Sequence, residues 1–335
     1  MPGSDGPGRS IDRQYSTGAA VNCYPLIERK VEETSASASA PAKINLWLEV
    51  LHRRADGFHE VETLMAPISL FDRLHIQIEG DQDNLEVMGE GAPSNDENLV
   101  MQALQLARQT RSIPPLAIQL TKNIPSRAGL GGGSSDAAAM LVLLDELFEA
   151  PGGRVELKQQ AALLGSDVPF FLGSGSAFAT GRGEQLHDAP QPFLGGDEAH
   201  FILWIPEIGV DTAAAYASLS GHLTSGDSHR KFRECDFMEK SVWVGSLHNR
   251  LLDGVRRIEP ALHEVANFLD RWHPGRWTMT GSGSGFIIAA PDQEVAKEEV
   301  QSLRSRLVEF CADLKVTGSV ARMVLEAQLW RPAVS

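Results

Sequence analysis

The chain has 335 residues, of which 30 are Lys or Arg and 44 are Asp or Glu, so its formal charge is −14. This charge argues against a general affinity for nucleic acid or anionic lipid, because the field of the protein repels phosphate groups. The sequence contains no apolar run of the roughly 18–20 residues that a membrane helix needs. Cys23, Cys235 and Cys311 lie far apart, which excludes a zinc cluster or a disulfide framework and favours a cytoplasmic protein.

The first 40 residues differ from the rest, since they are rich in small residues and lack apolar periodicity. We predict that residues 1–40 form a disordered or loosely attached extension. Ordered structure is expected from Pro41 onward, because apolar residues alternate along 44–50 as they do in a strand. Similar patterns predict further strands over 74–78 and 116–120.

Helical spacing follows in the same half of the chain. Apolar residues from Leu99 to Ala107 predict a helix capped by Asn95 or Asp96. A long helix is predicted over 135–148 and a short one over 156–164.

The second half mixes strands and helices without a regular βαβ alternation. We predict strands over 201–205 and on both sides of a turn in 278–290, a strand pair in 315–327, helices near 247–271 and 293–311, and a polar loop over 219–235. Such a mixture favours an α+β fold of two domains, 41–195 and 196–335, that meet at a cleft.

A glycine-rich loop runs directly into the predicted long helix. Gly129 and Gly131–Gly133 provide four glycines in five positions, so the backbone can approach a ligand closely. The start of the helix offers unpaired N–H groups and a positive dipole end to an anion. No Lys follows the glycines, which excludes a Walker A loop, and no dinucleotide-binding frame is evident. A phosphate cradle is favoured, and a Gly-rich turn without a ligand is the alternative.

Asp167 and Lys43 are candidate catalytic residues, each with a structural alternative. An acidic residue such as Asp167, between Gly165 and Pro169, is usually a turn residue. Its carboxylate could also act as the general base that accepts a proton from a substrate hydroxyl. Lys43 shares a strand face with Asn45 and is ordinarily a solvated flank. Beside a carboxylate and a γ-phosphate, its charge would stabilise the transferring phosphoryl group. From these segments alone, the structural interpretation is favoured for both residues.

Two other turns carry possible binding groups. Phe58 and His59 follow the tight turn at Gly57, and the pair could stack on and hydrogen-bond a base, although local core is the default for Phe58. The segment after His59 lacks the second histidine of a zinc protease motif. The turn 280–285 either donates N–H groups or is a hairpin bend.

In this order, these motifs resemble the GHMP kinase superfamily from about Pro41 to residue 325. The resemblance rests on Pro41-Ala42-Lys43-Ile44-Asn45-Leu46, Arg54-Ala55-Asp56-Gly57-Phe58-His59-Glu60, the loop at 125–135, Gly165-Ser166-Asp167-Val168-Pro169-Phe170-Phe171, and Thr280 to Gly285. The glycine loop is specific to the superfamily. The Arg-x-Asp-Gly-(Phe/Tyr)-His-Glu element is typical of its members that act on a cytidine diphosphate-linked sugar alcohol.

The resemblance implies the two-domain α+β architecture of this superfamily, with the active site in the interdomain cleft. It implies ATP-dependent phosphorylation of the 2-hydroxyl of the cytidine diphosphate-linked sugar alcohol, in the non-mevalonate route to isoprenoids. Asp167 would be the general base, and Lys43 would orient and polarise the hydroxyl.

The resemblance also assigns ligand contacts. Phe58 and Tyr216 would sandwich cytosine, His59 would read the edge of the base, and Asn45 would hold the substrate near the reacting centre. Asn98 and Lys122 would neighbour the adenosine. The ATP phosphates would be wrapped by Pro125, Ser126, Arg127, Ala128, Gly129, Leu130, Gly131, Gly132, Gly133, Ser134 and Ser135.

Mg²⁺ is expected with ATP, although the sequence assigns it no carboxylate cage. Ser134 or Ser135 is the candidate protein ligand. We expect a monomer or a weak homodimer without a nucleic-acid or membrane partner. Asp211 stands where the family often has Ser, and a negative charge there would weaken diphosphate binding if it pointed inward.

Three alternatives remain. Another small-alcohol kinase of the superfamily, of the mevalonate or homoserine type, would not need Phe58, His59 or Tyr216. A nucleotide-binding regulatory relative would have lost catalysis, which the retention of Lys43 and Asp167 argues against. A diphosphomevalonate decarboxylase is disfavoured by the Asp-Gly-Phe-His element.

Overall fold

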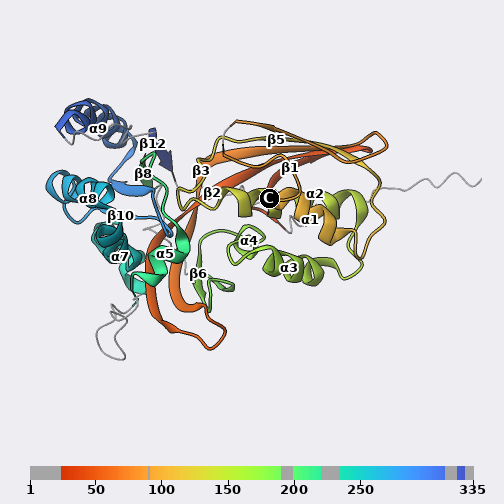
Figure 1. Ribbon diagram of the computed structural model, residues 1–335, viewed down its shortest axis with the longest axis horizontal. Helices are drawn as coiled ribbons and strands as arrows, with labels where there is room; N and C mark the ends of the chain where they lie inside the picture. The colour runs from red at the N-terminus through yellow and green to blue at the C-terminus, as the bar shows by residue number, and fades with distance from the viewer. Residues whose placement is uncertain are drawn as a thin grey trace, which may run out of the picture.

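The computed structural model describes residues 24–89, 91–189, 199–219, 232, 234–313 and 323–328. Two sheets, each covered by helices, lie side by side in Figure 1. The mixture of strands and helices confirms the predicted α+β class. Within the described residues, no helix combines the length and the apolar composition that crossing a membrane requires.

The larger sheet has eight strands within the described residues, with the path β1-β2-β3-β5-β4. β6 extends it from β3, β7 pairs with β6, and β9 pairs with β2. Its strands are β1 (Glu28–Val31), β2 (Ser35–Arg53), β3 (His59–Ile78), β4 (Asn84–Met88), β5 (Leu116–Thr121), β6 (Ala177–Thr180), β7 (Gln185–Asp188) and β9 (His248–Asn249).

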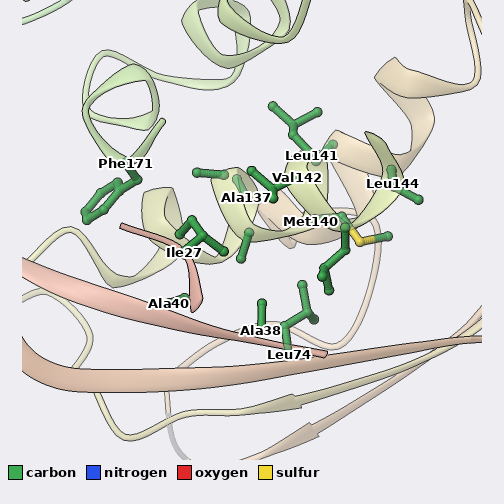
Figure 2. Packing of buried hydrophobic residues seen from close by; sticks show 14 of the residues in the cluster. Ile27, Ala38, Ala40, Leu74, Ala137, Met140, Leu141, Val142, Leu144 and Phe171 are labelled. Atoms are coloured by element: carbon green, nitrogen blue, oxygen red, sulfur yellow. The ribbon is translucent and has the colours of Figure 1, made fainter. Parts of the chain in front are cut away.

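One face of this sheet is covered by α1 (Leu99–Ala107), α2 (Gly132–Phe148), α3 (Gly153–Leu164) and α4 (Val168–Phe171). The ten residues 135–144 of α2 are all buried, as expected for a helix enclosed on every side. Figure 2 shows Met140 and Ala137 of α2 facing Ala38 and Leu74 of the sheet.

The smaller sheet has the order β10-β11-β8-β12. Its strands are β8 (His200–Ile205), β10 (Trp277–Met279), β11 (Phe286–Ala290) and β12 (Met323–Gln328). The helices and 3-10 turns of this half are α5 (Thr212–Ala217), η2 (Glu234–Phe237), α6 (Lys240–Trp243), η3 (Val244–Ser246), α7 (Leu251–Ile258), α8 (Pro260–Trp272) and α9 (Gln293–Asp313).

Every residue of β8 is buried, because both faces of the smaller sheet are covered. Ile202 and Trp204 pack into the cluster that includes α7 and α8. Phe201 and Leu203 pack with Ile44 of β2 in another cluster. This second cluster joins the two halves of the chain through a hydrophobic interface.

The prediction that order begins at residue 41 is wrong. All of β1 and residues 35–40 of β2 lie before Pro41. Tyr24 and Ile27 are buried in the core of the larger sheet. The Ser-Ala repeat at 35–40 is a strand whose small Ala side chains allow α2 to approach closely. Residues 1–23 of the predicted extension lie outside the described residues.

Other expectations differ in detail. α1 is capped by Asn98, rather than by Asn95 or Asp96. The predicted helix over 247–271 is divided at Pro260, since proline lacks the N–H that would continue the ladder. Residues 314–322 lie outside the described part, so the predicted strand pair is represented by β12. The polar loop 219–235 and the boundary near 195 also fall largely outside it, and the boundary stays a prediction.

Candidate active site

Lys43 and Asp167 lie together at a cavity, although 124 positions separate them in sequence. The Nζ atom of Lys43 is 3.4 Å from Oδ2 of Asp167. The lysine side chain is 3% exposed and the aspartate side chain 38% exposed. The lysine is therefore fixed within the protein, while the carboxylate faces the space where a substrate would lie.

Lys43 is placed by irregular pairing in β2. Register shifts against β3 occur between Pro41 and Ala42 and again between Asn45 and Trp47, and bulges of this kind re-aim side chains. The backbone N–H of Lys43 donates to the carbonyl of Leu130 in the glycine loop, at 2.9 Å. The glycine loop thus takes the place of a neighbouring strand along this part of β2.

A chain of hydrogen bonds orients Lys43. Its Nζ donates to Oδ1 of Asn45 at 2.6 Å. The Nδ2 of Asn45 donates to the hydroxyl of Thr63 at 2.7 Å, and that hydroxyl donates to the carbonyl of Trp47 at 2.7 Å. Because the Trp47 carbonyl is only an acceptor, it fixes the Thr63 hydroxyl, which in turn fixes the Asn45 amide with its oxygen toward Lys43.

The glycine loop 125–131 leads into α2, and Gly131 is its point of closest approach to Lys43. Gly131 has a φ of 71°, and a Cβ atom there would lie 3.0 Å from Cγ of Lys43 and 3.2 Å from the Phe171 ring. A glycine is required both by the conformation and by the space. The N-terminus of α2 consequently opens beside the Lys43 ammonium.

The turn 280–285 packs against the glycine loop rather than forming an isolated hairpin bend. The N–H groups of Ser284 and Gly285 donate to the carbonyls of Arg127 and Ala128, both at 3.2 Å. These N–H groups are therefore engaged within the protein. Gly281 and Ser282 of the same turn line the cavity.

The aromatic residues that were predicted to sandwich a base are both at the cavity, but their faces have other partners. The Tyr216 ring stacks on His59, with centroids 5.1 Å apart and planes at 21°. Phe58 is 53% exposed, and the guanidinium of Arg182 lies over its ring at 4.9 Å from the centroid. Burial raises the pKa of Tyr216 to about 12, and the charge of Asp167 adds to this effect.

His59 is suited to reading a neutral base. Its Nε2 atom is buried and has no hydrogen-bond partner among the described residues. Burial lowers the pKa of His59, and the charge of Arg53 lowers it further. The imidazole is thereby favoured in its neutral form, which has one donor and one acceptor nitrogen.

The negative charge of Asp211 has a structural partner. Oδ1 of Asp211 accepts a hydrogen bond from the N–H of Ala214 at 2.7 Å, so the residue caps α5. Asp211 is not among the residues that line the cavity, whereas its neighbour Thr212 is. The carboxylate of Asp211 is therefore engaged at the start of α5, and its effect on diphosphate binding stays a prediction.

Asn98 and Lys122, the predicted neighbours of adenosine, do not line this cavity. Asn98 accepts from the N–H of Val100 at the start of α1. The Lys122 ammonium is buried between the side chains of Asp72 and Asp136. Burial alone would lower the pKa of Lys122, but the two carboxylates raise it. Their proposed contacts with a nucleotide remain predictions.

One cavity of about 830 Å³ brings together most of the predicted site. Its lining includes the catalytic candidates, part of the glycine loop and the aromatic group: Lys43, Asn45, Phe58, His59, Gly129, Gly131, Ser134, Asp167 and Tyr216. Ser282, from the predicted turn 280–285, also lines it. Four further lining residues were not predicted: Arg53, Thr63, Arg182 and Thr212. These four lie on different elements, and only packing brings them together.

Residues 98–175 match the family model of the GHMP kinase N-terminal domain. The 4-diphosphocytidyl-2-C-methyl-D-erythritol kinase of Porphyromonas gingivalis is 39% identical over 248 residues, which cover 73% of this chain and 89% of that protein. The kinase of the same name from Syntrophus aciditrophicus is 36% identical over 260 residues, covering 77% and 91%. The chain belongs to the 4-diphosphocytidyl-2-C-methyl-D-erythritol kinase family.

Solved structures agree with membership of the 4-diphosphocytidyl-2-C-methyl-D-erythritol kinase family. A crystal structure of a 4-(cytidine 5'-diphospho)-2C-methyl-D-erythritol kinase matches with a TM-score of 0.68 and 32% identity, covering 88% of this chain and 98% of that chain. A mevalonate kinase from L. major matches with a TM-score of 0.61, 14% identity and coverage of 92% and 98%. At that identity, the second match shows the fold alone. The resemblance predicted from the motifs is confirmed.

Proposed function

We propose that the chain transfers the γ-phosphoryl group of ATP to the 2-hydroxyl of 4-diphosphocytidyl-2-C-methyl-D-erythritol. The observation that carries this proposal is the Lys43–Asp167 pair, which shares one cavity with the glycine loop and the Phe58–His59 turn. Such a transfer needs three parts: a loop that binds phosphate, a general base for the hydroxyl proton, and a group that recognises the cytosine. Membership of the family supports the same donor and acceptor.

The oxygen of the substrate hydroxyl would attack the γ-phosphorus, and the bond from that phosphorus to the oxygen of the β-phosphate would break. Asp167 would accept the proton that the hydroxyl loses. The ammonium of Lys43, 3.4 Å from the carboxylate, would stabilise the negative charge on the attacking oxygen and on the transferring group. Because Asn45 and Thr63 hold the ammonium in one orientation, little reorganisation is needed during transfer. Positioning and charge would supply most of the acceleration.

Substrate specificity would come from the cytidine end. His59 offers neutral nitrogens to the edge of cytosine, and Phe58 and Tyr216 offer aromatic surface. Arg182 and Arg53 add two positive charges to the lining, which suits a ligand that carries a diphosphate. A mevalonate or homoserine acceptor has no base for the aromatic group to contact, so the aromatic group, rather than the arginines, distinguishes the cytidyl substrate from these acceptors.

We also propose Mg²⁺ as the partner of ATP. Ser134 lines the cavity. Ser135 does not, and its hydroxyl is buried without a hydrogen-bond partner in the described part of the chain. The described residues contain no group of three or more His, Cys, Asp or Glu side chains that could hold a metal. Hydroxyl oxygens at the start of α2 fit an ion that takes most of its ligands from phosphate and water. The ion would neutralise phosphate charge when bound.

ADP release in the presence of ATP and Mg²⁺ tests the proposal, with a panel of acceptors. The panel contains the cytidyl-diphospho-methylerythritol, mevalonate, homoserine and galactose. Turnover confined to the cytidyl compound is the expected result. Turnover on another alcohol would discard the cytosine site, and nucleotide binding without turnover on any acceptor would favour a non-catalytic relative.

A further inference from the structure

β9 is a two-residue strand that attaches the second half of the chain to β2. His248 and Asn249 pair in parallel with Trp47 and Leu48, and the next N–H, that of Arg250, donates to the Leu48 carbonyl at 2.8 Å. This pairing fixes β9 to the strand that carries Lys43.

Side chains strengthen the same attachment. Nε2 of His248 lies 2.9 Å from Oε2 of Glu49, a residue that is 2% exposed. The imidazole also packs on the Trp47 ring, with centroids 4.7 Å apart. β9 therefore cannot shift along β2 without breaking buried polar and aromatic contacts.

Asn249 connects this fixed strand to the turn 280–285. Its Nδ2 donates to the carbonyl of Met279 at 2.7 Å and to that of Gly281 at 2.8 Å. Its Oδ1 accepts from the N–H of Leu251 at 2.9 Å. Both amide hydrogens and the amide oxygen are used, and the residue is 5% exposed. The two carbonyls that Asn249 holds flank Thr280.

Thr280 and Gly281 in turn touch the proposed catalytic groups. The Thr280 hydroxyl accepts from the N–H of Asn45 at 3.0 Å and donates to the Gly129 carbonyl at 3.3 Å. A Cβ at Gly281, whose φ is 56°, would lie 3.0 Å from the Gly129 oxygen and 3.4 Å from Nζ of Lys43. The backbone at 280–281 thus packs against Lys43 and the glycine loop together.

We propose that Asn249 is a positioning residue for phosphoryl transfer: it holds the turn 280–285 so that Lys43 and the glycine loop keep their relative placement. Asn249 does not line the cavity, so it acts through Gly281. This role rests on the proposed function. Removing the amide leaves two buried carbonyls without their donor, and the turn relaxes to satisfy them. A displacement of about 1 Å at reacting groups can cost about 100-fold in rate.

Asn249→Asp and Asn249→Ala test this role. Aspartate has the same shape as asparagine, but it places a carboxylate oxygen opposite the carbonyls of Met279 and Gly281. Alanine removes the two N–H donors without adding a charge. We expect both variants to lower kcat by at least about tenfold, with a smaller change in KM for the cytidyl substrate. Amide hydrogen exchange should become faster in 280–285 and 127–130.

Asp83→Asn is the matched control. Asp83 pairs with Arg108 and accepts from the N–H of Leu116, and it is not a cavity residue. The control removes the charge from a part-buried ion pair in the other half of the molecule, so we expect it to lower the free energy of unfolding while kcat and exchange in 280–285 stay at the wild-type values. All variants are compared at a temperature where each is folded.

Wild-type kcat and wild-type exchange in both Asn249 variants would overturn the positioning role. A loss of kcat no greater than that in Asp83→Asn would also overturn it. If the wild-type chain does not turn over the cytidyl substrate, the proposed function fails, and amide hydrogen exchange then tests the role of Asn249 separately. Faster exchange in 280–285 in both Asn249 variants supports the positioning role. Unchanged exchange overturns it.

Discussion

The ring of Tyr216 lies on the imidazole of His59, with centroids 5.1 Å apart. The two residues come from α5 and the start of β3, so one stacked pair ties the two halves of the chain together at the cavity. In the proposed complex, Tyr216 would contact two partners: His59, on which it already stacks, and the cytosine base.

Replacing Tyr216 or Phe58 with Ala should therefore raise KM for the cytidyl substrate. Loss of a stacking surface corresponds to about 1–3 kcal/mol, and Tyr216→Ala should have the larger effect because it also releases His59. Tyr216→Phe keeps the ring and should leave KM within about twofold. Steady-state kinetics at saturating ATP measure the effect. An unchanged KM in both Ala variants would place cytosine elsewhere.

Asp167→Asn should lower kcat by at least about 100-fold, because the amide cannot accept the substrate proton. The variant keeps the shape of the side chain, and Asp167 is partly exposed, so we expect the fold and nucleotide binding to survive. Single-turnover kinetics and binding of a non-hydrolysable ATP analogue separate the two properties. Near-normal turnover would refute the assignment of the base.

Thr63→Val should weaken the orientation of Lys43. The valine has nearly the same shape but removes the hydroxyl between Asn45 and the Trp47 carbonyl. Loss of these buried hydrogen bonds should lower the free energy of unfolding by about 1–3 kcal/mol and kcat by about tenfold. Thr63→Ser retains the hydroxyl and is the control for both measurements. Equal kcat in the two variants would show that the Asn45 amide needs no such support.

The stability of the chain should fall between about pH 4 and pH 8 through Asp136. Burial raises the pKa of Asp136 to about 8, and the charge of Asp72 adds to this, although Lys122 opposes it. The folded state then holds a proton that the unfolded state, with a pKa near 3.8, has released. The free energy of unfolding decreases as pH rises through this window and levels off above it.

Asp136→Asn removes this titration. We expect the dependence of the unfolding free energy on pH, measured by urea denaturation from pH 5 to pH 8, to be shallower in the variant. The difference should be of the order of 1 kcal/mol per pH unit at most, shared with Asp72 and Lys122 because the three groups titrate together. Parallel curves for wild type and variant would contradict a raised pKa at this site.

Local patterns in the sequence were sufficient to predict the strands at 74–78 and 116–120 and the helices over 99–107 and 135–148. They were also sufficient to predict the family. These depend on short-range periodicity and on contiguous motifs, such as the glycine loop and the Asp-Gly-Phe-His turn. The strand at 35–40 was missed, because its small residues become a strand face only when α2 packs on them.

Only the tertiary structure decided which of the candidate residues meet. Judged from its segment alone, Lys43 is a solvated flank, yet it is buried 3.4 Å from Asp167 because bulges in β2 re-aim it and the glycine loop closes over it. Lys122 is held between the side chains of Asp72 and Asp136, and Asp211 caps a helix. The chemistry of each side chain is fixed by the sequence. Its neighbours come from elements far apart along the chain, and only packing brings them within hydrogen-bond distance.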